Sequence, residues 1–215
     1  MPVARKSIAE LRNDLAKRFP TAQRPPGRAL RTGIPMLDQV TGGLPIAAVT
    51  EIVCAAPSCG GHLLLSQLLA TTRATQTRVA LIDSTDSFDP GSHPADLLAH
   101  LLWVRCASTA MALQAADLLA RDANLGLVVL DLRRAPEADL RRIPGPQWYR
   151  FQRAVEPTDL ALVVETPRAS VPSAQLRLAL NTPHAFRALE RERSALTTEL
   201  MLALSRQRLQ IASPG

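Results

Sequence analysis

Short apolar runs alternate with helix-forming segments through most of the chain, and this alternation restricts the fold more than any other feature. The runs are rich in Val, Ile and Leu; they cover residues 49–55, 78–83, 101–105, 125–131 and 160–165. Such runs are typical of strands buried on both faces of a parallel sheet, with helices as crossovers. The sequence therefore predicts an α/β fold with a mostly parallel central sheet. A further strand is expected at the sheet edge over residues 175–180.

The composition is that of a single globular domain. Of the 215 residues, 47% are hydrophobic but 3% are aromatic, so the core must be built from aliphatic side chains. No apolar run approaches the roughly 20 residues of a membrane span, and the N-terminus lacks the apolar stretch of a signal peptide. We therefore expect a cytoplasmic protein with no membrane partner, whose cysteines, Cys54, Cys59 and Cys106, are free thiols.

The chain divides into three parts. Residues 1–31 are expected to form an N-terminal helix, over residues 7–19, and a proline-rich linker. Residues 32–182 form the predicted core, and residues 183–215 a C-terminal extension whose leucines fit a helix and a strand equally well. Two arrangements of the N-terminal helix stay open: docking on a partner, including a second copy of the chain, or packing on its own core.

A set of motifs spans this core in a fixed order. TGIPMLDQVTGGLPIAAVTEIV at residues 32–53 leads into a turn rich in Pro, Ser and Gly; LIDSTDSFDP (81–90), LGLVVLD (125–131) and LALVVE (160–165) follow. This order resembles the core of the RecA superfamily. The resemblance implies a RecA-like three-layer sandwich, in which the turn after residue 53 is the counterpart of the phosphate loop and Asp131 that of the Walker B aspartate.

Further segments narrow the resemblance. They are RFPTAQRPPG at residues 18–27, LLWVR at 101–105, and QWYRFQRA at 147–154 followed by TPRASVPSAQLRL at 166–178. These segments resemble the ImuA (SulA-like) accessory proteins of bacterial mutagenic translesion synthesis. The resemblance implies a role in DNA repair within the SOS response to DNA damage, with a Y-family-like polymerase subunit and an error-prone DnaE-type polymerase as partners. It leaves RecA and single-stranded DNA open as further partners.

The phosphate loop lacks the residues that bind and activate ATP. A Walker A loop, GxxxxGK[ST], cradles phosphate with backbone N–H groups, neutralises it with lysine and holds Mg²⁺ with a hydroxyl. Residues 55–62 read AAPSCGGH. Ala55 replaces the first glycine, Gly61 the lysine and His62 the hydroxyl residue, and no lysine follows the first 17 residues. In the RecA pattern, Thr85 also stands where a glutamate positions the attacking water.

We therefore expect a vestigial nucleotide site without catalysis and without a bound cofactor. Its residues are Ala55, Gly60, Gly61, His62, Thr85 and Asp131. The leading hypothesis is a non-catalytic RecA-like adaptor. Two alternatives remain: a RecA/RadA-type DNA-dependent ATPase in which an arginine from elsewhere replaces the lysine, and a purely structural scaffold.

Arginines are concentrated around the aromatic segment that follows Asp131, in a chain with a formal net charge of +6. Arginine beside aromatic side chains can contact phosphates and stack on bases. The candidate DNA contacts are Arg133, Arg134, Arg141, Arg142, Arg150 and Arg168. The alternative is that Trp148 and Phe151 form the buried face of a helix whose arginines are merely solvated.

The residues around the phosphate loop also include a possible zinc pattern. Cys54, Cys59 and His62 have a spacing that zinc ligands can adopt. No fourth ligand is evident in the sequence, so we expect no metal and interpret the cysteines as small buried apolar side chains.

Overall fold

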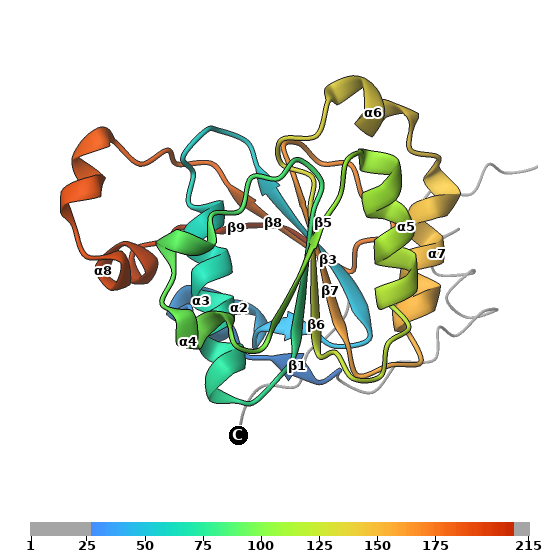
Figure 1. Cartoon of the computed structure of the whole chain (residues 1–215), viewed down its shortest axis with the longest axis horizontal. Helices are drawn as coiled ribbons and strands as arrows, with labels where there is room; N and C mark the ends of the chain where they lie inside the picture. The colour runs from blue at the N-terminus through green and yellow to red at the C-terminus, as the bar shows by residue number, and fades with distance from the viewer. Residues whose placement is uncertain (1–26, 209–215) are drawn as a thin grey trace, which may run out of the picture.

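The central sheet has seven strands and is covered by helices on both faces. The structure, a computed structural model, describes residues 27–208. The strands lie in the order β5-β4-β6-β7-β3-β8-β9 (Figure 1). Their bounds are β3 Ala48–Cys54, β4 Val79–Asp83, β5 Leu101–Arg105, β6 Leu127–Asp131, β7 Ala161–Thr166, β8 Leu176–Leu180 and β9 Ala203–Gln207. All neighbours pair in parallel except β8 and β9, which confirms the predicted α/β fold, a RecA-like three-layer sandwich.

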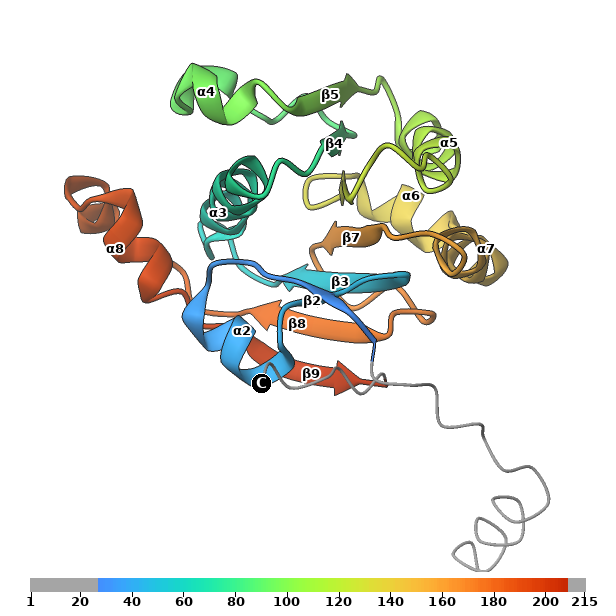
Figure 2. The ribbon, with the colours of Figure 1, turned by 90° about the horizontal axis from the view of Figure 1, so that it is seen from below.

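The helices form the two outer layers, as Figure 2 shows from a second direction. On one side lie α2 Pro35–Thr41, α3 Gly61–Ala74, α4 Ala95–Leu98 and α8 Arg193–Thr198; on the other lie α5 Thr109–Leu119, α6 Glu137–Arg142 and α7 Gly145–Val155. Short elements complete the described chain: β1 Ala29–Leu30, β2 Leu44–Pro45 and the 3₁₀ helices η1 Pro90–Ser92 and η2 Phe186–Glu190. Each layer buries its own apolar cluster against the sheet, so two cores sandwich the strands.

The aromatic segment forms α7, and the expectation that Trp148 and Phe151 lie on the buried face of this helix is confirmed. Trp148 and Phe151 are 2% and 0% exposed, and their rings meet edge to face with centroids 6.0 Å apart. Gln152 fixes the same face to the sheet, because its Oε1 accepts the backbone N–H of Val49 in β3 at 3.0 Å. The rotation of α7 is therefore set from the core outward.

The C-terminal extension adds a strand to the sheet. An edge strand was predicted over residues 175–180, but β8 is internal because β9 pairs antiparallel with its outer side. Of the leucines that fit a helix and a strand equally well, Leu196 lies in α8, which ends at Thr198, and Leu204 lies in β9, which begins at Ala203; Leu200 and Leu202 lie in the connection between them. The open edges of the sheet are therefore β5 and β9.

The predicted N-terminal helix and linker precede the core of the fold. The helix predicted over residues 7–19 lies outside the described residues, and residues 29–30 of the predicted linker form β1, which pairs with β2. Within residues 27–208, no helix combines the length and the apolar character needed to cross a lipid bilayer.

The carboxyl ends of three neighbouring strands bring acidic residues to one level of the sheet. Asp83 of β4 is in register with Asp131 of β6, and Asp131 with Glu165 of β7. Glu165 is in register with Ile52 of β3, the strand that leads into the phosphate loop. Ligands of open α/β sheets bind outside this edge. The candidate site is therefore built where these four strands end.

Candidate functional site

The loop between β3 and α3 keeps the turn that a phosphate loop needs. Gly60 has φ of 98°, in the left-handed region that glycine adopts without strain, and its carbonyl accepts the N–H of Leu64 at 2.9 Å. Ala55, at the first glycine position, is exposed at the start of the loop. The loop thus keeps a left-handed glycine directly before α3, at the place where the Walker A pattern has its second glycine.

Arg133 fills the place where the lysine side chain of a working loop would begin. A Cβ atom on Gly61 would lie 2.4 Å from Nη1 and 3.2 Å from Cδ of Arg133. The first of these distances is shorter than real side chains show, so a residue larger than glycine at position 61 would displace the guanidinium. The absent Cβ of Gly61 and the buried position of Arg133 therefore depend on each other.

The guanidinium of Arg133 is held by two carboxylates at the carboxyl ends of β6 and β7. It donates from Nε to Oδ1 of Asp131 at 3.0 Å and from Nη2 to Oδ2 at 2.5 Å. Oε2 of Glu165 lies 3.0 Å from the same Nε but accepts no hydrogen bond from the described residues, because that single N–H points to Asp131. The side chains are 11%, 4% and 1% exposed for Arg133, Asp131 and Glu165. The sequence placed Arg133 among the DNA contacts; its guanidinium instead faces the interior.

The charges of this cluster leave little attraction for a phosphate. Burial, opposed by the charge of Arg133 and assisted by the charge of Asp131, raises the pKa of Glu165 to about 7. His62, at the hydroxyl position, is exposed, but partial desolvation and then the charge of Arg133 lower its pKa, which keeps the imidazole neutral at pH 7. One guanidinium is thus shared by two carboxyl groups, and the neighbouring imidazole adds no positive charge.

The raised pKa of Glu165 predicts a pH dependence of stability. Between its ordinary value of 4.5 and about 7, the folded protein binds this proton more readily than the unfolded chain. The contribution of Glu165 to the free energy of unfolding is therefore full below this window and is lost as the pH rises through it, by at most about 1.4 kcal/mol per pH unit. Urea unfolding across this range should show wild type losing stability relative to Glu165→Gln as the pH rises, because the amide resembles the protonated carboxyl and does not titrate. A difference that is flat with pH would contradict the raised pKa.

Residues of the C-terminal extension contact the phosphate loop from the other side. The N–H of His184 donates to the carbonyl of Ser58 at 2.9 Å. A Cβ on Gly60 would lie 2.3 Å from Cδ1 of Leu200, a side chain that is 2% exposed. The side chain of Leu200 thus packs against Gly60, which occupies the position of the second glycine of the Walker A pattern.

The two acidic residues at and after the end of β4 are both engaged in contacts within the protein. Asp83 is fully buried and accepts the N–H groups of Thr85 at 3.2 Å and Phe88 at 2.8 Å, so it stabilises the turn. Thr85 is exposed. The next carboxylate, Asp86, pairs with Arg105 on the edge strand β5, whose Nε donates to it at 2.7 Å. Asp86 is thus engaged with Arg105, and Thr85, which stands at the glutamate position of the RecA pattern, has no carboxylate.

Most of the other predicted DNA contacts pair with acidic neighbours at the surface. Arg141 and Arg168 share Oε1 of Glu137, at 2.6 and 2.8 Å. Arg142 lies 4.0 Å from Asp139, and Arg150 pairs with Asp117; Arg134 is exposed and has no ion pair within residues 27–208. The structure does not gather these arginines into one bare patch, and DNA contact through them stays a prediction.

The loop thiols are buried and unbonded. Cys54 and Cys59 are 9% and 5% exposed, and burial, followed by the charge of Glu165, raises the pKa of Cys54. Cys106 lies after β5, where its N–H donates to the carbonyl of Asp83 at 2.9 Å. In the described part of the chain, no three His, Cys, Asp or Glu side chains are grouped as metal ligands would be. The thiols are packed as small apolar side chains.

The sequence analysis missed Glu165 as a member of this site. The available signal was an acidic residue at the end of LALVVE, an otherwise apolar strand, which requires a buried counter-charge.

No protein-family model matches the chain, and no curated protein matches it. Functional inference therefore depends on the geometry of the loop and on the motifs in the sequence.

Proposed function

We propose that the chain is a non-catalytic RecA-like accessory protein that acts through protein partners in DNA-damage-induced mutagenic translesion synthesis. The observation that carries the non-catalytic part is the position of Arg133 at the phosphate loop. It lies against Gly61, where lysine would begin, and is neutralised by Asp131 and Glu165. The polymerase partners follow from the resemblance to the ImuA proteins.

A nucleoside triphosphate could bind only if the contacts that hold this loop together were broken. Phosphate binding at a helix N-terminus requires free N–H groups and unpaired positive charge. Here the guanidinium is already bonded to Asp131, and a triphosphate would bring several negative charges beside two buried carboxyl groups. Coordination of Mg²⁺ by Asp131 would likewise require the carboxylate to give up its hydrogen bonds with Arg133. The loop therefore serves as part of the scaffold.

Nucleotide binding tests the non-catalytic part directly. We expect no change in the melting temperature when Mg-ATP is added, and no hydrolysis in the presence of single-stranded DNA, because Arg133 and Asp131 are already paired with each other. Differential scanning fluorimetry and a phosphate-release assay measure these two quantities. A melting temperature that rises with Mg-ATP in wild type but not in Asp131→Ala would instead support the alternative of an atypical ATPase.

The partner side of the proposal is tested in cells. The tagged chain, isolated after DNA damage, should retain a Y-family-like polymerase subunit and a DnaE-type polymerase, as identified by mass spectrometry. Isolation from undamaged cells is the control. Recovery of the chain alone, or only of further copies of itself, would support the structural scaffold.

A further inference from the structure

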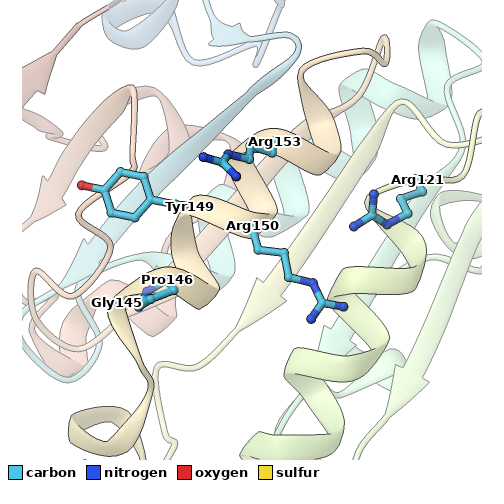
Figure 3. A pocket seen from close by; sticks show the side chains of 6 residues that line it. All are labelled: Arg121, Gly145, Pro146, Tyr149, Arg150 and Arg153. Atoms are coloured by element: carbon cyan, nitrogen blue, oxygen red, sulfur yellow. The ribbon is translucent and has the colours of Figure 1, made fainter.

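The outer surface of α7 forms, with the end of α5, a cleft of about 670 Å³ that the nucleotide site does not use. Its lining residues are Arg121, Gly145, Pro146, Tyr149, Arg150 and Arg153 (Figure 3). This volume lies within the range of about 300–1,000 Å³ that ligand pockets take. The cleft therefore has the size of a binding site, and its lining is rich in arginine.

The burial of the opposite face of α7 determines which side chains line this cleft. Trp148, Phe151 and Gln152 are fixed against the sheet, as described above, so Tyr149, Arg150 and Arg153 must point outward. Tyr149 is 51% exposed. Its half-exposed side chain leaves an aromatic ring accessible beside the arginines of the cleft.

The cleft carries net positive charge. Asp117 of α5, 14% exposed, accepts from both Arg150 and Arg121, the latter at 3.4 Å. One carboxylate thus holds two guanidinium groups near each other across the two helices. Arg153 has no ion pair or hydrogen bond within residues 27–208. Three guanidinium groups against one carboxylate leave the cleft attractive to an anionic ligand.

The side chains lie on both flanks of α7, as Figure 3 shows. Arg150 points towards α5 and Arg121, while Tyr149 and Arg153 leave the helix together on the opposite flank. A single small anion can reach one flank only. A chain with repeated negative charges that crosses α7 contacts both flanks, and unpaired bases along that chain can stack on an exposed ring.

We propose that this cleft binds single-stranded nucleic acid, with the phosphates contacting Arg121, Arg150 and Arg153 and a base stacking on Tyr149. The proposal rests on the accessory function proposed above and adds a nucleic-acid contact to it. It uses a surface separate from the phosphate loop, so neither site requires the other. Duplex DNA is disfavoured because its bases are already stacked and closed to Tyr149.

The test measures binding of a fluorescent oligothymidylate of about 20 nucleotides, longer than the common site sizes, by anisotropy at low and moderate salt. Arg153→Glu should weaken binding at least about tenfold and reduce the salt dependence, because a phosphate contact is lost and a repulsion added. Tyr149→Leu should weaken binding about fivefold or more, whereas Tyr149→Phe should retain it. Thermal unfolding verifies that each variant is folded.

Arg187→Glu is the matched control, because it makes the same charge change at an exposed arginine of η2, outside the cleft. Binding should fall much less in this variant than in Arg153→Glu. Equal losses in both would show non-specific attraction to a basic protein, and a loss in Arg187→Glu alone would place the contact at η2; either result overturns the cleft. Wild type that binds a poly-glutamate peptide but no oligonucleotide would make the occupant an acidic protein segment and also overturn the proposal. Recovery of polymerase partners by the Arg153→Glu variant, measured separately, tests the accessory function on its own.

Discussion

Replacement of Arg133 by alanine should lower the free energy of unfolding by about 3–5 kcal/mol, the usual cost of removing one partner of a buried ion pair. Asp131 and Glu165 are 4% and 1% exposed and would face each other without a counter-charge. Urea unfolding at pH 8 followed by circular dichroism measures the loss. Arg133→Lys should fall between alanine and wild type, because an ammonium group keeps the charge but not the paired geometry of the guanidinium.

The neighbouring arginine provides the control for this experiment. Arg134 is exposed, and its replacement by alanine should change the free energy of unfolding by no more than about 0.5 kcal/mol. Addition of Glu165→Gln to Arg133→Ala should restore part of the loss, because an amide needs no counter-charge. If Arg133→Ala were as stable as Arg134→Ala, the guanidinium would not be held at the loop as described.

Replacement of Glu51 by alanine should also cost about 3–5 kcal/mol. Glu51 is fully buried in β3 and pairs with Arg177 of β8, whose side chain is 14% exposed. It also accepts from Oγ1 of Thr166 and the N–H of Val171, each at 3.0 Å. Its removal leaves a buried guanidinium and a buried N–H without their acceptor, so both the charge and the hydrogen bonds contribute.

The same unfolding measurement separates these two contributions. Glu51→Gln keeps a carbonyl oxygen for the N–H groups but loses the charge that pairs with Arg177, so it should cost less than alanine. Glu190→Ala, an exposed glutamate at the end of η2, should be close to neutral. A Glu51→Ala protein that unfolds at the wild-type urea concentration would show that the pair adds nothing beyond its own desolvation cost.

The strands and the parallel sheet could be predicted because each core strand is apolar on both faces, a pattern that depends only on local sequence. The position of β8 could not be predicted in the same way. Whether it lies at the edge depends on β9, which follows α8 after a short connection, and their leucines fit both periods. Pairing with β8, a contact between segments distant in sequence, determines that residues 203–207 form a strand.

The same distinction applies to the candidate site, where local motifs predicted some residues but not the contacts between distant segments. Motif spacing located Gly61 and Asp131, because their distances along the chain are fixed by the strand and turn that carry them. The partners of Arg133 depend on β6 and β7 lying side by side, which places Asp131 level with Glu165. The cleft depends likewise on α5 and α7 being neighbours in space (Figure 1). Such contacts follow from the order of strands and helices and leave no local pattern in the sequence.

The contact between Gly61 and Arg133 bears on how this chain can evolve. Lysine at position 61 would start 2.4 Å from the guanidinium and add a second cation beside it, so that substitution alone should destabilise the protein. Loss of Arg133 alone leaves Asp131 and Glu165 uncompensated. Each single substitution towards a loop with lysine at position 61 thus begins with a less stable protein. We expect descendants of this sequence to keep or change the two positions together.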